Sequence, residues 1–243
     1  DTKIWGQILK VVILAGGIGS RLSELTKLIP KPMVKIVNEP IIVKIIKHYN
    51  KYGYKDFIIA GGYKFEIIKK YFKAHLKNLN IKVVNTGKKS MTGGRIRRLK
   101  KILGKKTFLL TYGDGLSDVN LDKLVRFHKK NKNYVTLTAV RPPARFGGIK
   151  ISGVKVKYFK EKSSLDEGWI NGGFFVMQPK IFKFLKNDQT ILERSPLEKI
   201  SKLKKLGAFK HHNFWQCMDT LRDKKKLEEL VKKKIFKWSK IEY

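Results

Sequence analysis

The residues best suited to chemistry lie near the start of the sequence, where glycines and cations follow an apolar run. The run Val11–Leu14 ends at Gly16-Gly17, after which come Gly19, Arg21 and, further on, Lys31. Glycines let backbone N–H groups approach an anion closely, because no Cβ intervenes and positive φ angles are allowed. Arg21 offers a planar guanidinium that can bind an anion through two N–H groups, and Lys31 offers a compact ammonium charge. These residues are suited to binding a phosphate; the alternative, which is the usual meaning of a lone glycine pair, is an ordinary strand-turn element with two solvated cations.

Two aspartates are candidates for a metal site. Asp114 follows the apolar run 107–112 and is flanked by glycines, and Asp219 follows the aromatic segment 214–218. Ligands of open parallel sheets lie beyond the carboxyl ends of the strands, and Mg²⁺ takes one or two carboxylates together with phosphate oxygens. Asp114 is therefore a candidate to hold Mg²⁺ against a nucleotide phosphate, with Asp219 as the candidate second carboxylate, although Asp114 taken alone is better interpreted as a turn residue. The alternatives are a turn at Asp114 and a helix N-cap at Asp219 or Thr220.

A third stretch combines glycines with arginines. Gly93-Gly94 predict a tight turn that opens a helix, with Arg95, Arg97 and Arg98 near its start. Cations at a helix N-terminus oppose the macrodipole, so this placement is unfavourable unless an anion binds there. It is a weak indication of an anion site, and solvated arginines are the alternative.

A fourth stretch is suited to a sugar phosphate. The Lys162 ammonium can bind a phosphate, while Glu161 and Asn171 can hydrogen-bond hydroxyls, with Gly172 beside them. The alternative is a surface ion pair followed by an Asn-Gly hairpin turn.

Strands alternate with helices along much of the chain. This pattern predicts an α/β fold with a doubly wound, mostly parallel (Rossmann-like) sheet and a smaller β-rich lobe. Strands are expected over residues 11–14, 56–62, 81–84, 107–112, 134–140, 148–151, 154–159 and 171–177. Helices are expected over residues 40–52, 65–72, 121–130, 179–185, 196–206 and 221–236.

Length and composition favour a globular protein. The chain has 243 residues, and its 42% of hydrophobic residues excludes a disordered chain. No apolar run approaches the roughly 18 residues of a membrane span. The single cysteine, Cys217, fits a reducing compartment, and residues 1–7 lack the features of a signal peptide. We expect a cytoplasmic protein without a membrane partner.

The net charge of +36 makes a polyanion or nucleic-acid binding protein the alternative from another class. The lysines are scattered along the whole chain, however, and no zinc-finger, RRM or basic-zipper motif accompanies them. We interpret the charge as a solvated lysine-rich surface and expect no nucleic-acid partner.

Two better-known phosphate motifs do not fit the first stretch. There is no Walker A string, and the dinucleotide fingerprint needs a third glycine where this chain has Leu22. Leu14–Leu22 (LAGGIGSRL) and Pro30–Met33 (PKPM) instead resemble, in the right order, the signature of the sugar-nucleotide pyrophosphorylases, a nucleotidyltransferase family. The segments Ser90–Arg95 and Asn171–Gly173 also resemble family segments, so the likeness spans most of the chain.

The resemblance implies a role for each matching residue. Arg21, Lys31 and Asp114 would be catalytic, and Asp114 and Asp219 would bind Mg²⁺. The sugar phosphate would be bound by Glu161, Lys162, Asn171 and Gly172. The nucleotide would be bound by Leu14, Ala15, Gly16, Gly17, Ile18, Gly19, Ser20, Arg21, Lys31, Ser90, Arg95 and Gly113.

The resemblance also implies the activity and the organisation. Ser90–Arg95 is similar to the segment of cytidylyltransferases, which implies CTP and glucose 1-phosphate as substrates; a thymidylyl- or uridylyltransferase is the alternative. Residues 1–243 would form one domain, with a nucleotide-binding half at about 10–140 and a sugar-phosphate-binding half at about 141–220. A C-terminal helix would cover 221–238, and the protein would be a homo-oligomer.

Overall fold

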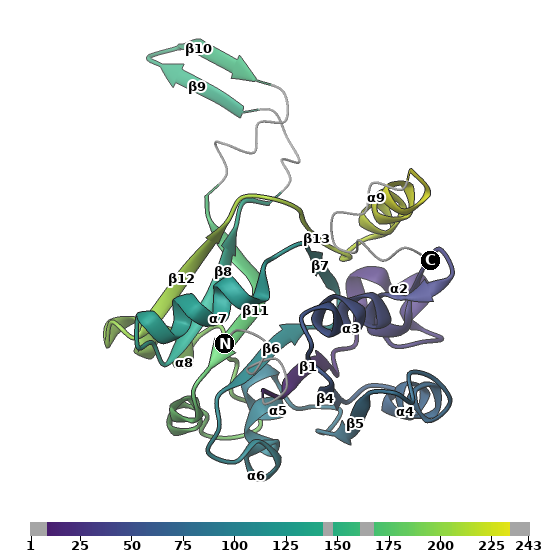
Figure 1. The fold of residues 1–243 in the computed structure, drawn as a ribbon. Helices are drawn as coiled ribbons and strands as arrows, with labels where there is room; N and C mark the ends of the chain where they lie inside the picture. Colours follow the sequence, from purple (N-terminus) through teal and green to yellow (C-terminus); the bar gives the residue numbers. More distant parts are fainter. Residues whose placement is uncertain (1–8, 143–147, 161–167, 234–243) are drawn as a thin grey trace.

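The computed structural model describes residues 9–142, 148–160 and 168–233. They build a seven-stranded sheet with helices on both faces (Figure 1). The strand order is β12 (Leu206–His211), β8 (Val135–Val140), β11 (Ile170–Met177), β6 (Phe108–Tyr112), β1 (Val11–Ala15), β4 (Asp56–Gly61) and β5 (Asn80–Asn85). Within this described sheet β11 alone runs antiparallel to its neighbours. The predicted α/β class with a mostly parallel sheet is confirmed.

Helices and short ribbons complete the described part of the chain. The helices are α2 (Ser23–Thr26), α3 (Ile41–Lys51), α4 (Phe65–Ala74), α5 (Thr92–Arg98), α6 (Lys100–Leu103), α7 (Leu121–Lys130), α8 (Ser195–Lys202) and α9 (Leu221–Lys232). Three 3₁₀ turns are η1 (Ser20–Leu22), η2 (Lys31–Met33) and η3 (Pro179–Phe184). Two-stranded ribbons pair β2 (Lys35–Ile36) with β3 (Glu39–Pro40), β7 (Gly115–Ser117) with β13 (Trp215–Cys217), and β9 (Gly148–Ser152) with β10 (Lys155–Lys160).

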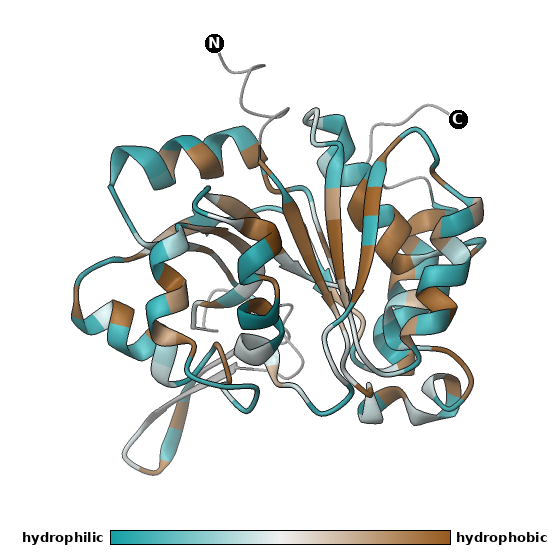
Figure 2. Cartoon of the chain, turned by 90° about the horizontal axis from the view of Figure 1, so that it is seen from below, coloured by the Kyte–Doolittle hydropathy of each residue, from teal (hydrophilic) through white to brown (hydrophobic). Residues whose placement is uncertain are grey.

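The hydrophobic core has two parts, one on each face of the sheet. In β1, Val11, Ile13 and Ala15 join the part that contains buried residues of α3, α4, α7 and α9. Val12 and Leu14 join the part that contains buried residues of α5, α8 and η3. A central parallel strand is buried on both faces, which explains why this segment is apolar throughout. Figure 2 shows the same arrangement, with hydrophobic strands between helices whose outer faces are hydrophilic.

Most predicted elements are present, and the exceptions lie in the second half of the chain. The predicted helix 196–206 ends at Lys202, because Lys204 adopts a left-handed backbone with φ 54° and the chain turns into β12. Strands β2, β3, β7, β12 and β13 were not predicted. The predicted helix 179–185 is the 3₁₀ segment η3.

The β-rich half contributes to the main sheet and also forms a separate ribbon. Strands β11 and β12 extend the sheet beyond β6, while the β9–β10 hairpin projects away from it (Figure 1). None of the helices in the described ranges is long and apolar enough to cross a membrane.

A buried histidine on α7 gives the fold a measurable pH dependence. His128 is 2% exposed, its Nδ1 lies 2.8 Å from Thr136 Oγ1, and its Nε2 is buried without a hydrogen-bond partner. Burial lowers the pKa of His128 from 6.5 to about 4. The unfolded chain therefore binds this proton more tightly, so stability is fully present above pH 6.5 and declines as the pH falls toward 4.

We expect the free energy of unfolding to fall by about 3 kcal/mol more in the wild type than in His128→Gln between pH 7 and pH 4. Urea unfolding at a series of pH values measures this difference. His75→Gln, at an exposed position, is the control and keeps the wild-type slope. If the unfolding free energy depended on pH in the same way in the wild type and in His128→Gln, the lowered pKa of His128 would be contradicted.

Candidate active site

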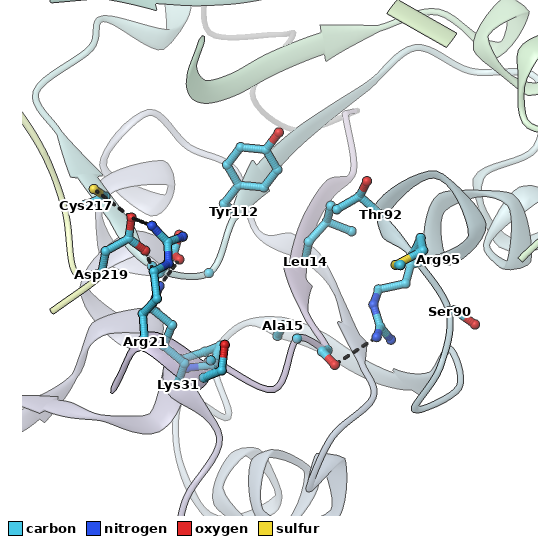
Figure 3. Close-up of a pocket in the computed structure, with 18 of the residues that line it drawn as sticks. Leu14, Ala15, Arg21, Lys31, Ser90, Thr92, Arg95, Tyr112, Cys217 and Asp219 are labelled. Carbon is cyan, nitrogen blue, oxygen red and sulfur yellow. Dashed lines mark hydrogen bonds and ion pairs between the residues drawn. The ribbon is translucent and has the colours of Figure 1, made fainter. Parts of the chain in front are cut away.

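The glycine loop lies at the carboxyl end of β1, as expected for a parallel sheet. After Ala15 the chain passes through Gly16 and Gly17 and turns at Gly19. This position requires glycine, because its φ is 71° and a Cβ there would lie 3.1 Å from the Lys31 Cβ. The loop then forms η1, which places Arg21 at the cleft. Figure 3 shows Leu14 and Ala15, at this end of β1, with Arg21, Lys31 and Asp219 on one side and Arg95 on the other.

The two aspartates come from distant parts of the sequence and are joined by a short ribbon. Asp114 precedes β7 and Asp219 follows β13, and these two strands pair antiparallel with Cys217 opposite Gly115. The Met218 N–H also donates to the Asp114 carbonyl oxygen at 2.8 Å. The ribbon brings the two carboxylates to the same side of the cleft.

Lys31 lies between these carboxylates. Its Nζ donates to Asp114 Oδ2 and to Asp219 Oδ1, each at 2.6 Å. Arg21 Nη1 lies 2.9 Å from the other oxygen of Asp219 (Figure 3), and its side chain is 71% exposed. The predicted meeting of Arg21, Lys31, Asp114 and Asp219 is therefore present in the structure.

The charges in this cluster stabilise one another. Burial acts to lower the pKa of Lys31, but Asp114 and Asp219 outweigh it and raise that pKa above its ordinary value. Burial acts to raise the pKa of Asp219, but Lys31 and Arg21 outweigh it and lower that pKa. Near neutral pH the lysine is protonated and Asp219 is ionised, so the cluster consists of opposite charges held close together.

Thr220, one of the two residues expected as a possible helix N-cap, is the N-cap of α9. Its side chain accepts from the Asp223 N–H, and Asp223 accepts from the Thr220 N–H, which forms a capping box at the start of α9. The Asp219 carboxylate is not used as this cap, so it faces Lys31 and Arg21.

The cluster and the glycine loop line one cleft of about 540 Å³. Most predicted site residues line it: Leu14, Ala15, Gly16, Gly17, Gly19, Ser20, Arg21, Lys31, Ser90, Arg95, Gly113, Asp114, Asn171 and Asp219. Two predicted residues do not line the cleft: Ile18, which is exposed, and Gly172, which is buried. The predicted Glu161 and Lys162 lie outside the described residues.

Arg95 is hydrogen-bonded to the glycine loop through a buried guanidinium. The side chain is 4% exposed, and its guanidinium donates to the carbonyl oxygens of Gly16 (2.8 Å) and Gly87 (2.7 Å) and to Thr86 Oγ1 (3.0 Å). Burial, together with Arg98, lowers the pKa of Arg95. A Cβ on Gly16 would lie 2.1 Å from the guanidinium. Gly16 is therefore required for the observed position of the Arg95 guanidinium.

The expected turn before the arginines is wrong. Gly93 and Gly94 lie inside the first turn of α5, where the missing side chains let the Asp188 and Thr190 carbonyl groups come close. The helix has only seven residues, so the arginines lie in its last turn. Cations at that end of a helix are stabilised by the macrodipole. Arg98 forms an ion pair with Asp188. The sequence pattern held no sign of how soon this helix ends.

Sequence reasoning missed several residues that line the cleft. They are Pro32, Met91, Thr92, Tyr112, Trp215 and Cys217. Burial and the neighbouring Asp219 and Asp114 raise the pKa of Cys217 to about 12, so its thiol is protonated and packs beside the carboxylates. The aromatic residues carry no motif of their own, and their position beside the motif segments was the only available signal.

Asn171 lines the cleft from an irregular part of β11. The register against β8 shifts between Asn171 and Phe175. The Trp215 Nε1–H donates to the Gly172 carbonyl oxygen at 2.7 Å, which holds this part of the strand from the β13 side. Such bulges re-aim side chains at active sites.

Comparisons with known proteins show the family of the chain. Residues 10–222 match the family model described as Nucleotidyl transferase. The chain belongs to the nucleotidyl transferase family. It is 43% identical to the glucose-1-phosphate cytidylyltransferase of Salmonella typhi, across 95% of this chain and 98% of that protein.

Two further relatives extend the comparison of this nucleotidyl transferase. It is 38% identical to the probable glucose-1-phosphate cytidylyltransferase of Bacillus subtilis, across 88% of this chain and 93% of that protein. The crystal structure of HddC from Yersinia pseudotuberculosis complexed with GMP-PN has the same fold, with a TM-score of 0.71 at 24% identity. That match covers 92% of this chain and 100% of the other.

The glycine pair of this nucleotidyl transferase allows a matched test of the loop. We expect Gly16→Ala to lower the free energy of unfolding by about 2–3 kcal/mol, because its Cβ displaces the Arg95 guanidinium from several carbonyl groups. Gly17→Ala has open space and is expected to change stability by less than about 0.5 kcal/mol. Urea unfolding compares the two variants. Equal losses of unfolding free energy would disprove the proposal that Arg95 supports the loop through Gly16.

Proposed function

We propose that this nucleotidyl transferase transfers a cytidylyl group from CTP to α-D-glucose 1-phosphate, giving CDP-glucose and pyrophosphate. A phosphate oxygen of the sugar phosphate attacks the α-phosphorus, and the bond from that phosphorus to the pyrophosphate oxygen breaks. The observation that carries the proposal is the convergence of Asp114, Asp219 and Lys31 beside the glycine loop. The names of the relatives from Salmonella typhi and Bacillus subtilis supply the substrates.

The chain's own residues align the reactants and neutralise charge. A phosphate monoester is anionic near neutral pH, so the attacking oxygen needs no general base. The N–H groups of the glycine loop bind the triphosphate, and the exposed Arg21 can move from Asp219 to the departing pyrophosphate. Lys31 offsets charge on the attacking phosphate. Alignment and electrostatic stabilisation of this kind dominate phosphoryl-transfer catalysis.

The donor set fits Mg²⁺. Asp114 and Asp219 offer hard carboxylate oxygens. The Lys31 Nζ lies 2.6 Å from one oxygen of each carboxylate, so both carboxylates face the same point. No group of three or more His, Cys, Asp or Glu side chains that could hold a metal occurs among the described residues. Two carboxylates completed by phosphate oxygens and water suit Mg²⁺. When bound there, Mg²⁺ would supply positive charge to the phosphate oxygens of the nucleotide.

The activity is tested by measuring pyrophosphate release with each of the four common nucleoside triphosphates, dTTP and glucose 1-phosphate. We expect CTP to give the highest kcat/KM with Mg²⁺ present. Asp219→Asn is expected to lower kcat by about 10²- to 10³-fold, because it removes a negative charge beside Lys31 and replaces a carboxylate that would bind Mg²⁺ with a neutral amide.

Other results would point elsewhere. Highest activity with UTP or dTTP would replace CTP in the proposal and leave the reaction class unchanged. No release with any nucleotide, together with tight nucleic-acid binding at physiological salt that CTP does not displace, would favour the polyanion alternative raised by the net charge.

Lys31 gives a second test that does not depend on turnover. Because its ammonium already neutralises both carboxylates, a divalent cation must compete with it. We expect Lys31→Met to bind Mg²⁺ or Mn²⁺ about tenfold more tightly than wild type when no nucleotide is present, while its kcat falls. Isothermal titration calorimetry measures the affinity, and Lys35→Met, at an exposed position, is the control. Unchanged metal affinity in Lys31→Met would refute the competition.

A further inference from the structure

Glu193 is an exposed residue that the proposed reaction does not use, yet both of its carboxylate oxygens are engaged beside the cleft. The Tyr112 hydroxyl donates to Glu193 Oε1 at 2.5 Å. The Thr92 hydroxyl donates to Glu193 Oε2 at 2.6 Å. Tyr112 and Thr92 both line the cleft, on different elements (Figure 3). Glu193 thus joins the end of β6 to the start of α5.

The contact with Glu193 decides where the Tyr112 proton points. A carboxylate oxygen only accepts hydrogen bonds, so the single phenolic proton is directed to Glu193. Toward Asn171 the Tyr112 oxygen can then act only as an acceptor. The Asn171 Nδ2 donates to this oxygen at 3.1 Å, which agrees with that direction.

The other end of the Asn171 amide is fixed by the backbone. Its Oδ1 accepts from the Gly173 N–H at 2.9 Å, and Gly173 has a φ of 80°. A Cβ on Gly173 would lie 2.5 Å from the Tyr112 ring, so the ring and the bulge pack directly together. With both ends assigned, Asn171 has one amide hydrogen and one carbonyl lone pair left for a ligand.

The Thr92 side of Glu193 has the same defined polarity. The Thr92 hydroxyl accepts from the Leu192 N–H at 2.9 Å, so its own proton goes to Glu193. Each hydrogen-bond direction in this network is defined once Glu193 is present. Removing its carboxylate would free the Tyr112 proton to turn toward Asn171, which would favour a flipped amide and break the bond to Gly173.

We propose that Glu193 is a positioning residue for the sugar phosphate: through Tyr112 it fixes the orientation in which the Asn171 amide meets a sugar hydroxyl. This inference rests on the proposed function, in which Asn171 belongs to the sugar-phosphate site. Glu193 itself does not touch the reacting atoms. Its effect is on the recognition of one substrate and not on the chemical step.

The test compares Glu193→Ala, Glu193→Gln and Tyr112→Phe, with Glu198→Ala as the matched control. Glu198 is an exposed glutamate on the neighbouring α8. We expect Glu193→Ala to raise the KM for glucose 1-phosphate about tenfold, and to change kcat and the KM for CTP by less than about twofold. Glu193→Gln is expected to stay within about twofold of wild type, since its amide oxygen accepts from Tyr112 and its NH₂ donates to Thr92.

A double-mutant cycle makes the route through Tyr112 explicit. If Glu193 acts through the phenol, the variant carrying both Glu193→Ala and Tyr112→Phe has the same KM for glucose 1-phosphate as Tyr112→Phe alone. A further increase in the double variant would place the action of Glu193 elsewhere and overturn the proposal.

Two other outcomes would also overturn it. One is a Glu193→Ala variant with wild-type KM values for both substrates. The other is an equal rise in both KM values with a lowered melting temperature and no rescue by Glu193→Gln, which is the behaviour of a structural contact. If the wild type does not use CTP and glucose 1-phosphate, the proposed function fails by itself. The same KM split is then measured with the substrate pair that the wild type does use, and it decides the role of Glu193.

Discussion

The site depends on one interaction: a single ammonium group held between two carboxylates. Two aspartates this close would repel each other and resist ionisation without a cation between them. Lys31 supplies that cation, and its position is set by the two prolines around it and by η2. The end of β6 and the β7–β13 ribbon place Asp114 and Asp219 against this ammonium, and the glycine loop leads to Arg21, which pairs with Asp219. The cleft is therefore organised by charge before any substrate enters.

Close approach of backbone segments shapes the rest of the cleft. Gly113 lies against the Leu14 carbonyl oxygen and the Pro32 ring, where a Cβ would be 2.9 Å and 3.0 Å away. The ends of β6, β1 and η2 can meet only because this position has no side chain. Gly16 and Gly173 meet the same need against Arg95 and Tyr112. Several glycines whose pattern indicates a ligand site also serve the packing of the protein itself.

The sequence predicted the parts of the site that have a local pattern. The glycine loop, Lys31 between two prolines and Asp114 after an apolar strand were all recognisable, because each depends on adjacent residues. The strand β12 was missed, because it is an edge strand that contains a glycine and a lysine and shows no clear alternation. The network of Tyr112, Asn171 and Glu193 was beyond reach, since long-range contacts leave no periodic signal in a single sequence.

The pairing of β7 with β13 has a consequence for how the protein is made. Because Asp219 lies far along the chain from Asp114, a ribosome-bound nascent chain can form the glycine loop and much of the parallel sheet long before the acid pair exists. Until β13 and Asp219 emerge, Lys31 has only one of its two carboxylates, and the cleft is more basic. Translation itself therefore keeps this charge cluster incomplete until β13 has paired with β7.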